Sequence, residues 1–380
     1  MIFFNPVKII FNAGARSELI NECVNRKTLI FCTETAYKRY QSDILLRDLF
    51  NSHNVFFEHS FNSNPSIDDI NRIGVKYKNH SINLVVGIGG GSAMDVAKIA
   101  SASIPAKYKN IDINDLLNDD KLFDKFTCLK CLQVPTTAGT GSEVTPFATI
   151  WDYGNQKKLS LSHSSIFPFK AIIDPDLLIG MPEDIALSTG LDALNQAFES
   201  IWNINSSPIS LNYAIKAACL SLKSLEKLKS INDLSHIRSN LSEASLYAGI
   251  AISQTRTSIC HSISYPLTLK FDIPHGLACA FSMKEVYKFN SPHIKESLYL
   301  IEQGIGKNPY EIICKIFKTF SIESKIASYI SNTQDVTDML EEMETKGRFD
   351  NNIRTCKQVD LDNIIKASLK RLQNEKVKNY

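Results

Sequence analysis

Two side chains on one predicted helix can meet at a single point. The segment 190–200 is rich in alanine and leucine, which predicts a helix. Asp192 and Gln196 are four positions apart, so both side chains leave the same face of that helix. Downstream, His261 and His275 add two imidazoles. A carboxylate with two imidazoles suits a divalent metal such as iron or zinc.

Each of these residues also has an ordinary structural interpretation. A single histidine near a helix end is more often a structural residue than a metal ligand, and this applies to His261 and His275 alike. Asp192 could instead be a helix N-cap, because it follows Thr189 and Gly190. From the residues alone, the metal site is a hypothesis.

A glycine-rich loop upstream has the form of a dinucleotide-binding turn. The apolar run 84–88 predicts a strand, and the loop leads from it into a predicted helix at 92–102. Glycine lets backbone N–H groups approach a diphosphate, and a helix N-terminus favours negative charge. The alternative is a tight turn that binds nothing. The candidate cofactor-binding residues are Gly89, Gly90, Gly91, Ser92 and Asp95.

A second polar loop follows the strand predicted at 131–134. Residues 135–145 contain four threonines, one serine and two glycines. Small hydroxyl side chains suit ribose and phosphate groups, and open α/β sheets bind ligands beyond the carboxyl ends of their strands. The alternative is a polar surface loop. The candidate cofactor-binding residues here are Thr136, Thr137, Thr140 and Ser142.

The order of predicted elements divides the chain into two domains. Strands and helices alternate up to about residue 180, which indicates a parallel sheet covered on both faces. Beyond that point helices dominate. The predicted strands are 28–32, 55–57, 84–88, 131–134 and 171–174, and the predicted helices are 66–78, 92–102, 210–230, 235–254, 310–329 and 361–373. We therefore expect an α/β, Rossmann-like dinucleotide-binding domain at 1–183 and an all-α metal-binding domain at 184–380.

Composition excludes several classes of protein. The 380 residues are 44% hydrophobic and 22% charged, with a formal net charge of +2, which gives no electrostatic case for nucleic acid or an anionic membrane. No apolar run approaches the roughly 20 residues of a membrane span. The first residues lack a signal-peptide pattern. Nine cysteines without framework spacing indicate a reduced, cytoplasmic chain.

Taken in order, these motifs resemble the iron-containing alcohol dehydrogenase family, which has the dehydroquinate-synthase-like fold. The resemblance implies an N-terminal dinucleotide domain and a C-terminal helical domain, with metal and nicotinamide in the cleft. It also implies a homodimer, and it adds Asn64 to the cofactor-binding candidates. The motifs keep the family's order and spacing over most of the chain; they are Asn64-Pro65, Gly89–Asp95, Pro135–Thr145, Asp174-Pro175, Gly190–Glu199, His261 and Pro274-His275-Gly276.

The resemblance also implies a metal-ligand set with one departure. The family uses one aspartate and three histidines, and Asp192, His261 and His275 match three of these positions. The fourth position carries Gln196, whose carbonyl oxygen is a neutral and weaker donor than imidazole. We expect Fe²⁺ or Zn²⁺, with the metal's identity left open.

Two positions bear on the nicotinamide cofactor. NAD-preferring members place an aspartate where this chain has Thr33, and loss of that carboxylate removes repulsion against a 2′-phosphate. The carboxylate of the neighbouring Glu34 argues against binding of a 2′-phosphate. NAD(H) and NADP(H) therefore both stay open. Lys158 falls where the family keeps a lysine near the ribose and phosphates; the alternative is a solvated charge.

Two further residues are candidates for catalysis. Tyr265 lies one turn after His261, where many members carry histidine, and its phenol could bind substrate or relay a proton; aromatic packing is the alternative. Arg256 lies five residues before His261, so only its long side chain would reach the metal. A cation there would suit an anionic substrate, whereas a salt bridge or an exposed arginine is the alternative.

Three segments resemble the phosphonate-associated branch of the family, whose members reduce phosphonoacetaldehyde to 2-hydroxyethylphosphonate. These segments are 194–197, 254–257 and 261–268. We therefore expect a metal-dependent NAD(P)H oxidoreductase acting on a small anionic aldehyde. The alternatives are reduction of another small or sugar-derived aldehyde, a dehydroquinate-synthase-like lyase, and a nucleotide-binding protein whose metal site has decayed.

Overall fold

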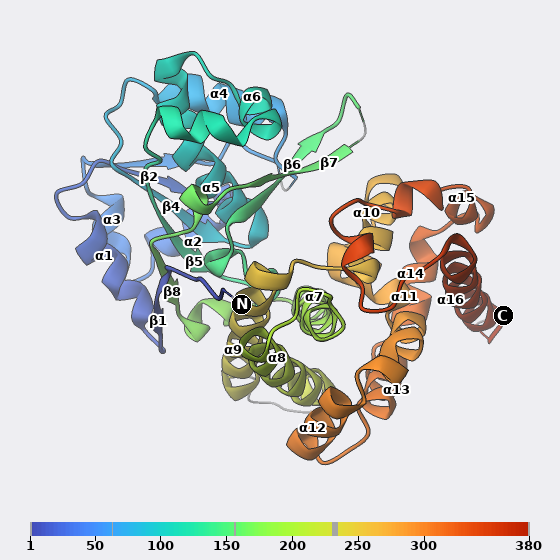
Figure 1. The fold of residues 1–380 in the computed structure, drawn as a ribbon. Coiled ribbons are helices and arrows are strands. Elements are labelled where there is room, and N and C mark those ends of the chain that lie inside the picture. The colour runs from blue at the N-terminus through green and yellow to red at the C-terminus, as the bar shows by residue number, and fades with distance from the viewer. Residues whose placement is uncertain (1, 63, 156, 230–234, 379–380) are drawn as a thin grey trace. The chain divides into compact units, whose positions relative to one another are not determined.

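The chain forms two compact units (Figure 1). The computed structural model describes residues 2–62, 64–155, 157–229 and 235–378. The α/β unit comprises Asn5–Thr137 and Ser142–Gly180, and the helical unit comprises Met1–Phe4, Ala138–Gly141 and Met181–Tyr380. The main chain thus passes into the helical unit after Gly180, whereas the predicted division after residue 183 lies at the first residue of helix α7.

A six-stranded parallel sheet forms the centre of the α/β unit. Its strand order is β1-β8-β5-β4-β2-β3. The three central strands are almost fully buried, which explains their continuous apolar runs in the sequence. The strands are β1 (Lys8–Phe11), β2 (Thr28–Phe31), β3 (Val55–Glu58), β4 (Leu84–Gly89), β5 (Lys130–Pro135) and β8 (Lys170–Ile173).

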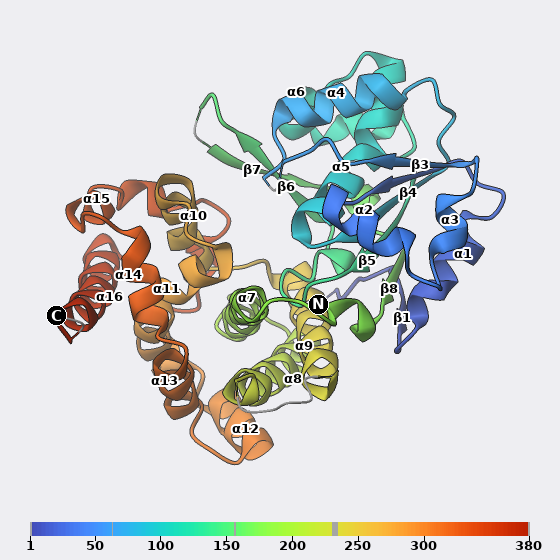
Figure 2. The same ribbon diagram turned by 180° about the vertical axis from the view of Figure 1, so that it is seen from behind.

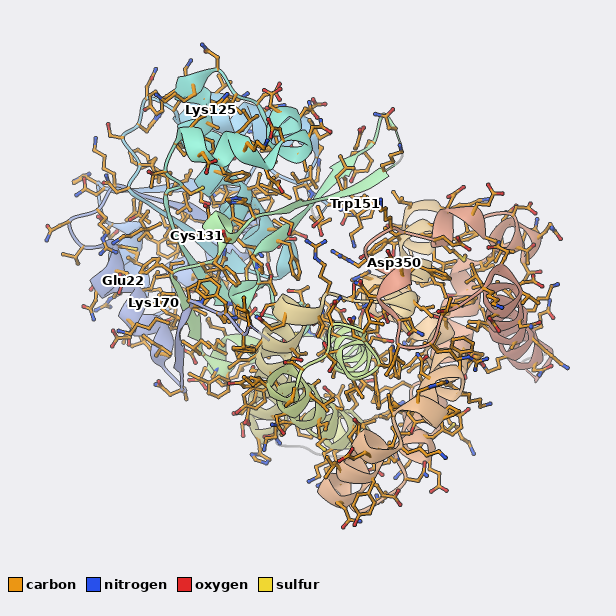
Figure 3. The ribbon with its side chains drawn as sticks, in the orientation of Figure 1. Glu22, Lys125, Cys131, Trp151, Lys170 and Asp350 are labelled. Atoms are coloured by element: carbon orange, nitrogen blue, oxygen red, sulfur yellow. The ribbon has the colours of Figure 1, made fainter. Side chains whose placement is uncertain are left out.

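Helices cover both faces of this sheet (Figure 2). Successive residues of β2 alternate between the faces, since Leu29 and Phe31 pack in one apolar cluster and Ile30 in the other. The first cluster includes α4 (Ile67–Tyr77), α5 (Gly91–Ala106) and α6 (Ile113–Asn118). The second includes α1 (Glu18–Cys23), α2 (Glu34–Gln41) and α3 (Arg47–Phe50). An ion pair between Lys170 and Glu22 fastens α1 to the sheet (Figure 3).

A β-hairpin extends the α/β unit and was absent from the sequence prediction. Strands β6 (Phe147–Asp152) and β7 (Lys157–Ser162) pair antiparallel. The Trp151 backbone N–H donates to the Pro65 carbonyl at 2.8 Å, which joins the hairpin to the segment before α4. The edge strand β1 was also missed. Strand β7 is largely solvent-facing and lacks the apolar run that marked the buried strands, whereas β1 contains the short apolar run 9–11 and lies partly exposed at the edge of the sheet.

The helical unit is built around α7 (Glu183–Ile201), which is buried from Gly190 onward. Both ribbon views show α7 between the pair α8 and α9 and the pair α10 and α11 (Figures 1 and 2). These four helices are α8 (Pro208–Lys227), α9 (Ser235–Thr255), α10 (Ile259–Phe271) and α11 (His275–Asn290). The others are α12 (Lys295–Ile305), α13 (Pro309–Thr319), α14 (Ile322–Tyr329), α15 (Gln334–Thr337) and α16 (Gln358–Lys378).

The prediction of one helix over 310–329 is wrong. The helix is interrupted between α13 and α14 at Ser321, which has a left-handed backbone with φ 50°. No glycine or proline marks this break, and apolar residues continue across it, so the sequence pattern concealed it. The helix predicted at 210–230 ends at Lys227, and residue 230 lies outside the described residues.

The predicted fold class is confirmed: a Rossmann-like parallel α/β unit is followed by an all-α region. Among the described helices, none combines the length and the apolar character that crossing a membrane requires.

Candidate functional site

The α/β unit places the two predicted loops at the carboxyl ends of adjacent strands. The chain leaves β2 toward β3 on one side and leaves β4 toward β5 on the other, so a topological switch point lies between β2 and β4. Open α/β sheets bind ligands in the crevice at such a point. Thr33 lies two residues after the end of β2, and Gly89 is the last residue of β4. The Thr136 N–H donates to the Gly89 carbonyl at 2.9 Å.

The glycine loop leads directly into a helix N-terminus. Gly90 is the N-cap of α5 and has no side chain that could accept the first N–H groups. Those groups and the helix dipole favour an anion. Thr137 lies against the loop, since a Cβ built on Gly90 would be 3.4 Å from its Oγ1. The arrangement can hold a diphosphate, and Ser92 lies in the same first turn.

Other cofactor candidates have structural contacts of their own. Thr33 accepts the Ala36 N–H at 3.2 Å as the N-cap of α2. The Asn64 carbonyl accepts the Tyr153 hydroxyl at 3.1 Å, and the Lys158 ammonium lies 5.6 Å from the centroid of the Trp151 ring. Asn64 is thus joined to the hairpin, and Lys158 is part of its strand β7.

Asp95 uses both of its carboxylate oxygens within the protein. Oδ1 accepts the Ser142 hydroxyl at 2.6 Å, and Oδ2 accepts the Thr149 N–H at 2.8 Å. The fully buried Lys98 ammonium lies 3.4 Å from Oδ1 and donates to the Ser142 carbonyl at 3.0 Å. Asp95 and Ser142 therefore hold the segment after the second loop against α5, which is a positioning role.

Beside this network, Glu143 is a buried carboxyl whose Oε2 has no partner among the described residues. Burial raises the pKa of Glu143 to about 7 from 4.5. Above pH 4.5 the unfolded chain releases this proton while the folded chain retains it until about pH 7, so stability falls across that window.

We predict that Glu143→Gln removes this pH-dependent loss of stability. Between about pH 5 and about pH 8, wild type should lose on the order of 2 to 3 kcal/mol of unfolding free energy relative to the variant. Urea unfolding at both pH values measures the difference. The exposed Glu341→Gln is the control and should behave as wild type; equal pH dependence in wild type and Glu143→Gln would contradict the assignment.

The helical unit brings the predicted metal ligands together. Asp192 lies on α7, His261 in the first turn of α10, and His275 at the first position of α11. The ligand atoms of these three residues and of Cys279 all lie within 4.8 Å of one another. His261 Nε2 is 3.2 Å from Asp192 Oδ1. Asp192 is well inside its helix, so the N-cap interpretation is wrong.

Gln196 lies beside this group. Its Nε2 donates to Asp192 Oδ1 at 3.1 Å and to the Thr140 carbonyl at 3.4 Å. Its Oε1 is buried and has no partner among the described residues. Thr140 belongs to the helical unit, where Gly141 passes so close to α9 that a Cβ there would lie 2.4 Å from the Gly249 Cα.

Glu199 contacts a predicted ligand, although it was not among the residues predicted for the site. It is fully buried, and its Oε2 accepts His261 Nδ1 while its Oε1 accepts the His261 backbone N–H at 3.0 Å. The bond at Nδ1 leaves Nε2, which faces Asp192, as the nitrogen available to a metal. The spacing in the sequence could have indicated this residue, because Glu199 follows Asp192 by two helical turns and therefore lies on the same face of the helix.

The charges of this cluster are coupled. Burial opposes ionisation of Asp192, but the hydrogen bond with His261 and the nearby His275 outweigh it and hold its pKa below the usual range. Burial likewise opposes a charge on His261, yet Cys279, Glu199 and Asp192 outweigh it and raise its pKa well above the ordinary value. A metal that binds here must displace a proton from His261.

We predict that Glu199→Gln weakens metal affinity about 10- to 100-fold, because the imidazole loses the carboxylate that orients it. Metal affinity is measured by competition with a chromophoric chelator. Glu243→Gln on α9, outside this network, is the matched control. Unchanged affinity in Glu199→Gln would mean that packing alone orients His261.

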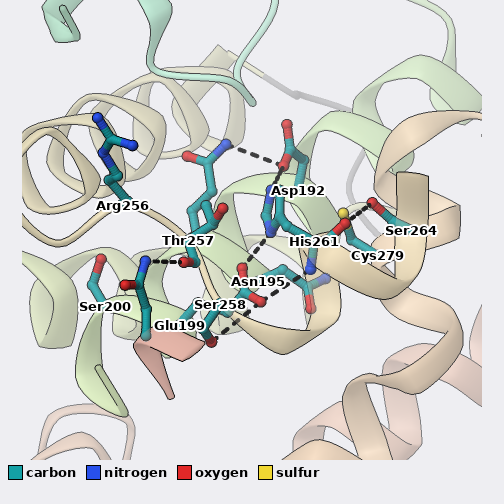
Figure 4. A network of polar contacts seen from close by, with 12 residues as sticks. Asp192, Asn195, Glu199, Ser200, Arg256, Thr257, Ser258, His261, Ser264 and Cys279 are labelled. Carbon is teal, nitrogen blue, oxygen red and sulfur yellow. Dashed lines mark hydrogen bonds and ion pairs between the residues drawn. The ribbon is translucent and has the colours of Figure 1, made fainter. Parts of the chain in front are cut away.

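The two catalytic candidates occupy different places. The Tyr265 ring stacks on His275 with centroids 6.4 Å apart, so Tyr265 lies beside the cluster. Arg256 follows α9, is exposed, and has a left-handed backbone with φ 61°. Its carbonyl accepts Asn203 Nδ2 at 3.3 Å, which helps to hold this strained conformation. In Figure 4, Arg256 lies apart from Asp192, His261 and Cys279.

The donor set fits a divalent metal of the iron or zinc kind. A carboxylate and two imidazoles converge, and both an amide oxygen and a thiol lie alongside. The buried Gln196 oxygen has no partner among the described residues, so a positive ion nearby would stabilise it. Cys279 was not predicted, although it follows His275 by one helical turn and therefore shares its face.

The sequence matches known family models over almost its whole length. The model for iron-containing alcohol dehydrogenases covers residues 6–175, and the model for the C-terminal region of Fe-containing alcohol dehydrogenases covers residues 186–377. The chain therefore belongs to the iron-containing alcohol dehydrogenase family.

Individual relatives differ in their named substrates. A phosphonoacetaldehyde reductase of Streptomyces viridochromogenes is 37% identical over 211 residues, which are 55% of this chain and 53% of the relative. A 1-propanol dehydrogenase of Salmonella typhimurium is 34% identical over 208 residues, which are 55% and 52% of the two chains. The matches thus span about half the length of these curated relatives.

Solved structures match over nearly the full chain. An iron-containing alcohol dehydrogenase from Thermotoga maritima has a TM-score of 0.83 at 28% identity, covering 97% of this chain and 99% of the other. A sulfoacetaldehyde reductase from Bifidobacterium kashiwanohense, solved in complex with NAD+, has a TM-score of 0.80 at 25% identity, covering 96% and 98%.

Proposed function

We propose that this chain is a metal-dependent, NAD(P)H-linked reductase that converts phosphonoacetaldehyde to 2-hydroxyethylphosphonate. The observation that carries the proposal is the convergence of Asp192, His261 and His275 in a member of this family. Fe²⁺ or Zn²⁺ at this group would polarise the aldehyde, and the dihydronicotinamide would supply the hydride. We retain NAD(H) and NADP(H) as alternatives and a homodimer as the expected assembly, which light scattering would test.

The chain's own residues would bind and orient these groups. Asp192 and the two imidazoles hold the metal, and Glu199 keeps Nε2 of His261 directed at it. The N–H groups at the start of α5 hold the cofactor's diphosphate. Tyr265, whose ring stacks on His275, would supply the proton that the product hydroxyl needs.

An anionic substrate is supported by the relatives and by two arginines. Phosphonoacetaldehyde and sulfoacetaldehyde, named for two of the relatives, are both small aldehydes with an acidic oxyanion group. Arg348 Nη1 donates to the Gly347 carbonyl at 2.9 Å, and a Cβ at Gly347 would lie 3.9 Å from Arg256 Nη1. Both guanidinium groups therefore adjoin Gly347, and together they suit a phosphonate.

A neutral aldehyde is the second candidate substrate. A relative named 1-propanol dehydrogenase has nearly the same identity as the phosphonoacetaldehyde reductase. The exposure of Arg256, and its separation from Asp192 and His261 in Figure 4, favour this alternative. Steady-state oxidation of NADH and NADPH with phosphonoacetaldehyde and with propanal decides between them. A preference of about 100-fold in kcat/KM for the phosphonate, roughly 2.7 kcal/mol, would support our proposal.

The same assay bears on the remaining alternatives. Equal or better rates with propanal would rule out the phosphonate as the preferred substrate but would still support an aldehyde reductase. Absence of turnover with either aldehyde, with Fe²⁺ or Zn²⁺ added, would favour a lyase or a nucleotide-binding protein.

We predict that Arg256→Ala lowers kcat/KM for phosphonoacetaldehyde about 30- to 100-fold, because a charge paired with the substrate anion is lost. The rate with propanal should change little. Arg238→Ala, in the first turn of α9, is the matched control for loss of a cation. If Arg256→Ala turned over both aldehydes as wild type does, the anion-binding role would be wrong.

A further inference from the structure

Cys279 lies among the predicted metal ligands. It is fully buried on α11, one helical turn after His275, and its Sγ is 3.9 Å from His275 Nε2. Together with Asp192 and His261, these residues offer four ligand atoms within 4.8 Å of one another. In Figure 4, Cys279 lies on the same side of the network as His261 and Asp192.

We propose that Cys279 is the fourth protein ligand of this metal and that the bound ion is zinc. The inference rests on the metal-dependent function proposed above and goes beyond it by naming a thiolate ligand. On binding, the thiol would release its proton to solvent and its sulfur would bond to the ion. The Gln196 amide would then stay next to Asp192 without ligating.

Geometry supports one ion shared by these four residues. Zinc bonds of about 2.0 to 2.3 Å in a tetrahedron place ligand atoms roughly 3.3 to 3.8 Å apart. The four atoms lie within 4.8 Å before any adjustment, and His261 Nε2 is already 3.2 Å from Asp192 Oδ1. Movements of about 1 Å or less in side chains would therefore complete the site, and zinc can expand to five ligands when an aldehyde oxygen binds.

Ligand softness favours the thiolate over the amide of Gln196. The amide oxygen is a neutral, hard donor, whereas a thiolate is a charged, soft donor that favours zinc. A nitrogen and oxygen set suits several divalent metals instead.

The test examines the metal's ligands directly in the full-length protein. X-ray absorption of zinc-loaded wild type should show one sulfur at about 2.3 Å. With cobalt in place of zinc, thiolate-to-metal charge transfer should absorb in the near ultraviolet. Cys279→Ser should lose both signals. Cys260→Ser is the matched control, because Cys260 is equally buried and adjoins His261 but lies outside the ligand group.

The outcomes separate this proposal from the proposed reductase. A wild-type zinc site with only nitrogen and oxygen ligands would overturn the role of Cys279, even if Cys279→Ser fails to fold. Gln196→Ala should retain the sulfur signal; its loss in that variant would overturn the assignment of Gln196 as a bystander. If wild type reduces aldehydes but its metal site contains no sulfur, the proposed reductase function holds and the role of Cys279 does not. If the sulfur signal is present without any turnover, Cys279 is a metal ligand and the proposed reductase function is wrong.

Discussion

Replacing Asp192 with asparagine is expected to lower kcat/KM for aldehyde reduction about 1,000-fold or more. Asp192 is the one carboxylate in the group of ligand atoms that the described residues form, so the variant removes the negative charge that offsets the cation. Polarisation by a metal contributes several kcal/mol to stabilising the developing oxyanion, and about 4 kcal/mol corresponds to this factor. Steady-state kinetics and metal analysis of the purified variant measure the effect.

The matched control is Asp184→Asn in the first turn of the same helix. Asp184 is exposed and pairs with Lys325, so its loss should leave metal content and turnover near wild type. Circular dichroism would confirm that both variants fold. An Asp192→Asn variant with full metal content and wild-type turnover would show that the metal is held elsewhere.

Gly276→Ala is expected to destabilise the protein by roughly 3 to 4 kcal/mol and to reduce its metal content. A Cβ at Gly276 would lie 1.7 Å from the Ser188 carbonyl oxygen, and this contact is with backbone, which cannot rotate away. The start of α11 would have to move from α7. His275 and Cys279 move with α11, so the ligand group would separate as well.

Denaturant unfolding and metal analysis of the same samples test this expectation. Gly154→Ala is the control, because a Cβ there meets only ordinary contact at 3.5 Å. If Gly276→Ala matched the control in stability and metal content, the close approach of α11 to α7 would be wrong.

The sequence was sufficient to predict the buried strands of the sheet, but it did not predict the edge strand β1 or the hairpin. Strands 84–88 and 131–134 were recognisable because burial on both faces of a parallel sheet demands uninterrupted apolar runs. The hairpin at 147–162 has one solvent-facing strand and therefore carries a weaker signal. The break at Ser321 left no mark, because the residues on both sides keep apolar spacing.

For the candidate site, the family motifs supplied Asp192, His261 and His275, and helical spacing explained why Gln196 lies beside Asp192. The same spacing points to Glu199 and Cys279, which follow Asp192 and His275 by whole turns. Spacing alone could not select them, because every helix presents many residues at such intervals and only packing decides which face meets the ligands.

What the sequence by itself determined are the local features: a glycine loop between a strand and a helix, and pairs of residues on one helical face. These depend on residues a few positions apart. Tertiary structure alone decided that α7, α10 and α11 bring Asp192, His261 and Cys279 to one point. It also decided that Glu199 orients His261 and that Arg256 lies apart from the cluster. These relations join residues up to 87 positions apart, as Asp192 and Cys279 are, so they arise only when the helices pack.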